Sequence, residues 1–168
     1  PSSSVFRSER EAISSWARRF ISSSPPRSIS FASSSSAGEI DLTNGTLGMA
    51  IATQGGSSID AIELREAGDY TLIGVPGAAV LALVSAAVYL DIVEVDGVGI
   101  DPISLQFEPV FSPSSGLFDL GTGVPLLAGI WNGALAIDVS QALRDRSLEG
   151  GATKVWLTLS NVLATVSE

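Results

Sequence analysis

The sequence contains neither cysteine nor histidine. This excludes thiol nucleophiles, zinc sites built from these two residue types, and the side chain whose unperturbed pKa lies nearest neutrality. Charged residues are also scarce, at 16% of the chain, and no spacing among the acidic residues selects a carboxylate pair of the kind that glycosidases use. These absences favour a protein that is not an enzyme and that has no resident organic cofactor.

The composition is typical of β-structure. Apolar residues make up 45% of the 168 residues, which is enough for one domain whose core needs neither metal nor disulfide. The 17 glycines and 8 prolines, among many Val, Ile, Leu and Thr residues, favour short strands separated by turns. We therefore expect a mainly β protein, an antiparallel two-sheet β-sandwich that is jelly-roll-like, with a short N-terminal amphipathic helix.

The charge is distributed unevenly along the chain. Residues 1–38 contain five Arg and two Glu, a net charge of +3, whereas residues 39–168 contain four basic and sixteen acidic residues, a net charge of −12. The acidic body would repel phosphate backbones, so we do not expect it to bind nucleic acid. The sequence predicts two regions, a Ser/Arg-rich N-terminal arm over 1–38 and a β-sandwich domain over 39–168.

The arm carries the pattern of a short amphipathic helix. Ser8 is a candidate N-cap with Glu11 three residues later, apolar residues recur at helical spacing over residues 9–21, and Pro25-Pro26 follows. Large aromatic side chains are candidates for contacts with another copy of the chain, since such side chains contribute much of the affinity of interfaces. In the arm they are Phe6, Trp16, Phe20 and Phe31. Packing on its own domain, or a loosely held terminus, is the alternative.

From Glu39 the pattern changes to strands with turn signals. Asn44-Gly45 stands between two alternating apolar runs, which predicts a hairpin over residues 39–53. Ala67-Gly68 predicts a second turn between two strands. Further along, Ser140 as a cap and the following residues predict one short helix near 140–148.

Residues 70–90 contain no charged side chain, so they could span a membrane as one helix or fold as two strands around Pro76-Gly77. The proline removes a helical hydrogen bond and the glycine adds an entropic cost, together about 4 kcal/mol against a helix. The remaining residues 78–90 are fewer than the ~20 that a bilayer requires. We therefore expect two strands and no transmembrane helix, with residues 78–90 in a strand that is buried on both faces.

Alternation is clearest near the end of the chain. Val155, Leu157 and Leu159 lie on one face of a predicted strand, and Trp156 lies on the other. Trp131 is expected in the core, because large aromatic side chains dominate core burial.

The C-terminal half contains a series of short motifs in a fixed order. They are Val95-Asp96-Gly97, Pro113-Ser114-Ser115-Gly116, the segment from Trp131 to Asp138, and the stretch from Thr153 to Glu168. In this order they resemble bacterial exported proteins of the PEP-CTERM type over about residues 92–168, although the sorting tail of that family is absent after Glu168. The resemblance implies a secreted or surface-attached β-sandwich and carries no active site over to this chain.

Four acidic residues gather near one predicted strand end and its turn: Asp91, Glu94, Asp96 and Asp101. Carboxylate oxygens are the ligands that calcium prefers, so these residues form a weak candidate calcium site. The D-x-D-x-D-G loop of dedicated calcium sites is absent. Acidic residues also gather at turns because they are well solvated there, which is the competing interpretation.

Two classes of non-enzymatic function remain. We expect an extracellular or cell-surface structural protein that assembles with copies of itself into a filament or matrix, through strand edges and the N-terminal arm. A cell-surface or matrix polymer is a further candidate partner. The alternatives are a coat or capsid shell subunit, and a monomeric secreted adhesion or carbohydrate-binding module.

Overall fold

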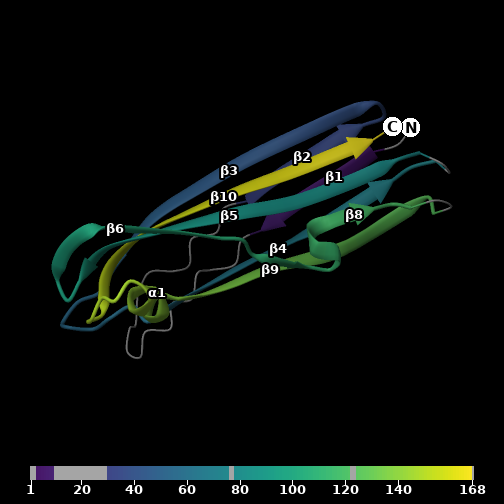
Figure 1. Ribbon diagram of the computed structural model, residues 1–168. Helices are drawn as coiled ribbons and strands as arrows, with labels where there is room; N and C mark the ends of the chain where they lie inside the picture. Colours follow the sequence, from purple (N-terminus) through teal and green to yellow (C-terminus); the bar gives the residue numbers. More distant parts are fainter. Residues whose placement is uncertain (1–2, 10–29, 76–77, 122–123, 168) are drawn as a thin grey trace.

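The computed structural model describes residues 3–9, 30–75, 78–121 and 124–167 (Figure 1). These residues form ten strands, one short α-helix and one 3-10 turn. The elements are β1 (Ser3–Glu9), β2 (Ser30–Ser36), β3 (Glu39–Ala52), β4 (Ala61–Ile73), β5 (Val80–Val95), β6 (Val98–Phe107), β7 (Val110–Ser112), η1 (Ser114–Gly116), β8 (Leu117–Asp119), β9 (Leu126–Asp138), α1 (Val139–Asp145) and β10 (Ala152–Ser167).

All strand pairs are antiparallel, and they form two sheets. The first sheet has the order β2-β1-β4-β9-β7, and the second has the order β3-β10-β5-β6, with β8 pairing with β5 on the same edge as β6. The prediction of a mainly β, antiparallel protein with two sheets is thus confirmed.

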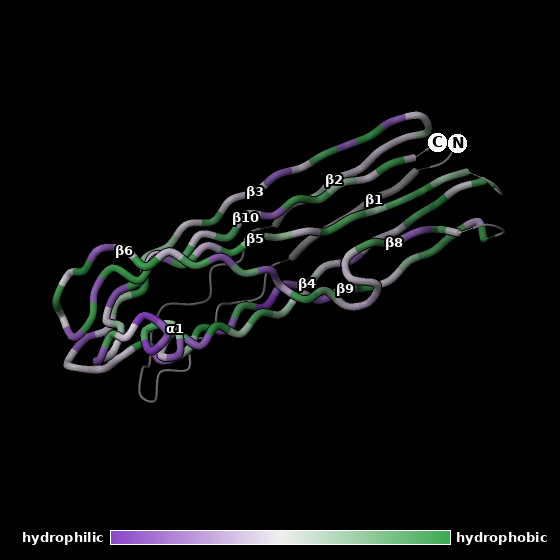
Figure 2. The backbone as a smooth tube through the Cα atoms, in the orientation of Figure 1, coloured by the Kyte–Doolittle hydropathy of each residue, from purple (hydrophilic) through white to green (hydrophobic). Residues whose placement is uncertain are grey.

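The two sheets share one apolar core. Alternate residues of β5 point inward and are at most 7% exposed from Val80 to Ile92, and Figure 2 shows hydrophobic colour along much of this strand. From the first sheet, Trp131 is fully buried, as predicted. Tyr70 of β4 stacks on Phe118 of β8 with ring centroids 4.1 Å apart, so aromatic contacts join the sheets across the core.

Two of the predicted turns are wrong. Asn44-Gly45 lies inside β3, where Asn44 pairs with Val162 and Gly45 with Asn161 of β10. Ala67-Gly68 lies inside β4, which continues through it and pairs with β9 along its whole length. In both cases a long partner strand and an inward-facing row of side chains outweigh a local preference for a turn.

The uncharged run at 70–90 does divide into two strands, because β4 ends at Ile73 and β5 begins at Val80. Among the described residues, no helix has the length and apolarity to cross a membrane. The prediction that this strand is buried on both faces is wrong, however. Its outward side chains are open to solvent, with Leu83 37% and Tyr89 43% exposed, because no further layer among the described residues covers the second sheet from outside.

Two segments of the predicted arm belong to the first sheet. β1 lies between β2 and β4 and pairs with both of them. The boundary predicted at residue 38 falls in the turn between β2 and β3, which connects the sheets, and there the Gly38 amide donates to the Ser167 carbonyl at 2.6 Å. Apart from Glu9, the last residue of β1, the helix predicted over 9–21 lies outside the described residues.

The short helix predicted near 140–148 is present as α1. Its N-cap is Asp138 instead of Ser140, because the Asp138 carboxylate accepts a hydrogen bond from the Gln141 amide at 2.7 Å. The helix follows β9 directly, so the same aspartate ends the strand and begins the helix.

Candidate functional site

Three of the four predicted calcium ligands bind donors of the chain itself. Asp91, on the outer face of β5, accepts a hydrogen bond from the Ser104 hydroxyl at 2.6 Å. Glu94 accepts one from the Thr153 hydroxyl at 2.7 Å. Asp96, in the turn between β5 and β6 with φ 49°, accepts one from the Gly151 amide at 2.9 Å. These contacts join β5, β6 and the start of β10.

Asp101, the fourth residue of that set, is exposed on β6. In the part of the chain that the structure describes, no group of three acidic side chains is placed to hold a metal ion. The structure therefore gives separate structural roles to Asp91, Glu94 and Asp96, and the calcium hypothesis stays a prediction.

The structure describes the backbone of two of the four aromatic residues that were predicted to contact another copy. Phe6 lies in β1 opposite Tyr70 and Ser33, and Phe31 lies in β2 opposite Ser8. Trp16 and Phe20 lie outside the described residues. Their contact with a second copy therefore stays a prediction.

The outer face of the second sheet carries a surface that we call the neutral strip. It consists of the outward positions of three neighbouring strands, five from each and fifteen in all, and none of them is charged. Its apolar end is open to solvent, with Ile40 75% and Leu42 58% exposed. The strip comprises Ile40, Leu42, Asn44, Thr46 and Gly48 of β3, Thr158, Ser160, Val162, Ala164 and Val166 of β10, and Leu81, Leu83, Ser85, Ala87 and Tyr89 of β5.

Exposed apolar side chains continue beyond the strip on both sides. Leu117 of β8, 51% exposed, lies opposite Leu83. Trp156 follows the strip along β10 and is 49% exposed, with the Lys154 ammonium 5.9 Å from its ring centroid. The apolar outer surface thus extends over four strands.

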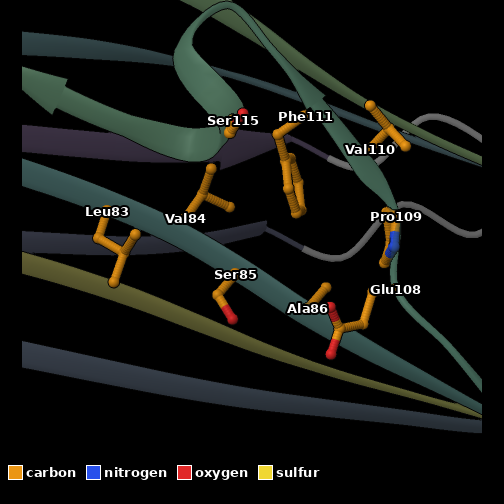
Figure 3. Close-up of a pocket in the computed structure, with 9 residues that line it drawn as sticks. All are labelled: Leu83, Val84, Ser85, Ala86, Glu108, Pro109, Val110, Phe111 and Ser115. Carbon is orange, nitrogen blue, oxygen red and sulfur yellow. The ribbon is translucent and has the colours of Figure 1, made fainter.

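A cavity of about 400 Å³ lies where one edge of the second sheet is interrupted (Figure 3). On this edge β6 pairs with β5 over Val88–Val95, and β8 pairs with it over Leu81–Leu83. Between them the chain leaves the sheet, forms β7 in the first sheet, and returns through η1. No described strand pairs with residues 84–87 on this edge, so the backbone of β5 borders the cavity.

One wall of the cavity is Phe111, the central residue of β7. Phe111 lies opposite Gly133, where an added Cβ would come within 2.6 Å of the phenyl ring. The ring also packs edge-on against Trp131, with the centroids 5.7 Å apart. Phe111 is therefore held in one position by the first sheet and presents its ring to the cavity.

The opposite end of the cavity is closed by η1. Ser114, Ser115 and Gly116 all have left-handed backbone conformations, with φ of 61°, 51° and 86°. A Cβ on Gly116 would lie 2.4 Å from the Val84 carbonyl oxygen. Only glycine allows this close approach, and through it the turn is packed directly on β5.

The interior also contains a charged residue, Glu66 of β4, which is 3% exposed. The Asn161 side-chain amide of β10 donates a hydrogen bond to its carboxylate. This contact joins the two sheets through the core. The hydroxyls of buried Ser33 on β2 and Thr165 on β10 also lie 3.5 Å apart. A buried carboxylate requires such partners.

Asp41 joins the sheets at their edge. Its carboxylate accepts hydrogen bonds from the Ser33 hydroxyl at 2.7 Å and from the Ser34 amide at 2.9 Å. These two contacts, the Ser33 hydroxyl first, lower the pKa of Asp41, because they stabilise its ionised form.

Comparisons with protein-family models, with curated proteins and with solved structures find no match to this chain. The geometry of the neutral strip and of the cavity therefore carries the functional argument. Local sequence patterns do not identify Ala86, Glu108 and Phe111 as cavity residues, since only the interrupted pairing of β5 brings them together.

Proposed function

We propose that this chain is a non-enzymatic structural protein that assembles with copies of itself, as the subunit of an extracellular filament or matrix. The neutral strip on the second sheet carries the proposal. A contiguous exposed apolar patch is rare on a protein that works as a monomer and is typical of a protein interface, and the apolar end of the strip, at Ile40, Leu42 and Leu83, is of this kind.

The sequence of β5 supports an additional layer outside the second sheet. Its outward positions Leu81, Leu83 and Ala87 give the strand the nearly continuous apolar character of strands that are covered on both faces. The described part of the chain covers only the inner face. A second copy placed on the strip would remove the outward apolar side chains from water, which is the main driving force of association.

Electrostatics favours the same surface. The chain has a net charge of −9, so two copies repel one another at most orientations. The repulsion is smallest where the facing surfaces carry no charge, and the neutral strip is such a surface. A copy of the same chain is therefore the occupant that we propose.

The dimensions of the strip are those of an interface centre. Nine residues along each strand extend for about 27 Å, and the three strands are about 10 Å wide between the outer two backbones. A stable interface buries about 800 Å² on each partner. The strip would form the apolar centre, with Trp156 and Leu117 extending it at the margins.

We further propose that the two sheets form a jelly-roll-like β-sandwich. The order β3-β10-β5-β6 in one sheet and β2-β1-β4-β9 in the other supports this, because consecutive strands alternate between the sheets from β2 to β5 and from β6 to β10, and β10 returns between β3 and β5. Coat proteins and lectins use this architecture, so a coat shell subunit is the second candidate. The C-terminal resemblance to PEP-CTERM exported proteins supports the extracellular location.

Static light scattering at increasing protein concentration and at two salt concentrations tests the proposal. We expect the mean mass to rise with protein concentration, and to rise further between about 0.05 M and about 0.5 M salt, because salt screens the repulsion between acidic copies. Association through the basic arm and the acidic body would instead weaken with salt. A monomer under all these conditions would contradict the proposed function.

A further inference from the structure

The interruption in the second sheet leaves backbone hydrogen-bonding groups of β5 without a described strand partner. The Val80 carbonyl points to this edge, because it accepts a hydrogen bond from the Leu120 amide at 3.0 Å. In an antiparallel strand every second residue directs both its N–H and its C=O to the same edge. Ala86 therefore directs its N–H and C=O into the interruption, where no described strand pairs with it.

The chemistry of a matching ligand follows from this pair of groups. In antiparallel pairing, the N–H and C=O of one residue bind the C=O and N–H of a single residue opposite. An α-amino-acid unit within a peptide carries an acceptor and a donor at that spacing, whereas a sugar hydroxyl or a single amide does not reproduce both. The exposed edge at Ala86 therefore favours an extended peptide.

The space along the edge is short. Residues 84–87 extend for about 13 Å, and Gly116 already occupies the Val84 end. β6 ends at Phe107 on one side, and β8 begins at Leu117 on the other. About three residues of an incoming peptide fit between them, so one of its ends must lie at the interruption.

The direction of the peptide and the charge at the cavity determine whether its amino or its carboxyl end lies at the interruption. A peptide antiparallel to β5 runs in the same direction as β6, so its first residue lies beside the end of β6, where Glu108 follows. Glu108 and Ala86 line the same cavity, and Figure 3 shows the Glu108 carboxylate on the Ala86 side. Among the described residues that line the cavity, none is basic. We propose that this cavity binds the free amino terminus of an extended peptide, with its α-ammonium group beside Glu108 and its second residue paired with Ala86.

The side chain of that second residue has a defined environment. Paired residues of neighbouring strands direct their side chains to the same face, and Ala86 faces inward at 7% exposure. The small Ala86 side chain leaves room beside the Phe111 ring, whereas the neighbouring inward positions of β5 carry the larger Val84 and Val88. An apolar second residue, such as valine, therefore fits the site.

The probe is the tripeptide amide Gly-Val-Gly with a free amino terminus, titrated to about 5 mM against the full chain. Isothermal calorimetry gives the affinity, and two-dimensional NMR reports the Ala86 amide. We expect binding that shifts the Ala86 amide resonance. Acetylation of the amino terminus should weaken binding at least about tenfold, because the charge-assisted contact with Glu108 is lost. Methylation of the valine nitrogen should abolish binding, because it removes the donor to Ala86.

Variants of the chain test whether the peptide binds in this cavity or elsewhere on the protein. Glu108→Gln should weaken the free peptide about tenfold and remove the difference between the free and acetylated forms, whereas Glu149→Gln, an exposed carboxylate outside the cavity, should change neither. Ala86→Val should block the site by filling it; if that variant does not fold, Glu108→Gln and the two modified peptides decide the question. Absence of binding by the free peptide, equal binding of the acetylated one, or an unshifted Ala86 amide would overturn the proposal.

Discussion

The outer faces of the two sheets differ in charge, whereas their inner faces are both mainly apolar. On the first sheet, the outward row of β4 contains Glu63, Arg65 and Asp69, and the Arg65 guanidinium binds the Glu63 carboxylate with N to O distances of 2.5 and 2.7 Å. The neutral strip on the second sheet contains no charge. Both inner faces are apolar because they form one core. Core packing therefore explains why the inward side chains are apolar, but it does not explain why the outward side chains of the neutral strip are uncharged.

Single exposed apolar residues do not account for this difference. The first sheet also exposes Leu126 and Ile130, at 53% and 72%, but Ile130 lies opposite the charged Asp69. Scattered apolar residues are normal on protein surfaces, whereas a contiguous patch without charge is not. This difference supports the proposal that a second copy covers the outer face of the second sheet.

The largest effect is expected when a charge is placed on the strip. Ala164→Glu should weaken self-association at least about 100-fold, because an unpaired carboxylate would be buried between two copies. Ala128→Glu, an outward alanine of β9 on the first sheet, is the matched control and should change association less than about threefold. Light scattering measures both variants. An equal loss in the two would mean that the faces do not differ.

A smaller effect is expected when apolar area is removed without adding charge. Ile40→Ser combined with Leu42→Ser should weaken association about tenfold or more, since each side chain contributes about 1–2 kcal/mol when it is buried by a partner. The melting temperature of the isolated monomer should hardly change, because both side chains are more than half exposed. A large drop in monomer stability with unchanged association would place these side chains in the fold instead of the interface.

The first sheet offers the reverse experiment. Glu63→Gln combined with Arg65→Gln removes its ion pair and should change the free energy of unfolding by less than about 1 kcal/mol, because exposed pairs contribute little. Urea denaturation measures this change, and light scattering should detect no new association. If association appeared, absence of charge alone would be sufficient to make an outer face adhesive.

The smallest effect concerns Asp41, which joins the edges of the two sheets. Its pKa is lowered in the folded chain, so ionised Asp41 stabilises the fold above the ordinary aspartate value of about 3.9. This contribution is lost as the pH falls through the lowered pKa. Asp41→Asn should therefore lower the melting temperature slightly at neutral pH, with a smaller difference from the unmodified chain at about pH 3. A difference that grows in acid would contradict this assignment.

Alternation along single strands was sufficient to predict much of the fold. It identified the inward residues of β10, whereas Pro76-Gly77 predicted the division of the 70–90 run, and the preference of large aromatic side chains for the core predicted the burial of Trp131. Alternation was insufficient at Asn44-Gly45. These residues are held in β3 by pairing with β10, which comes late in the chain and leaves no signal in the sequence around them. The cavity likewise could not be predicted from local patterns, because Glu108 and Phe111 meet Ala86 only where β6 has left β5 and β8 has not yet paired with it. The four acidic residues were predicted from proximity in sequence, whereas the donors that bind three of them, Ser104, Gly151 and Thr153, come later in the chain.

The position of β10 has a consequence for synthesis of the protein. It is synthesised after all the other described strands, yet it lies between β3 and β5, which do not pair with each other. Until residues 152–167 emerge, both strands have open edges and uncovered apolar rows, the conditions under which nascent chains pair wrongly or aggregate. Translation that stops before Ala152 removes the centre of a sheet instead of its margin, so the shortened product lacks the strand that joins β3 to β5.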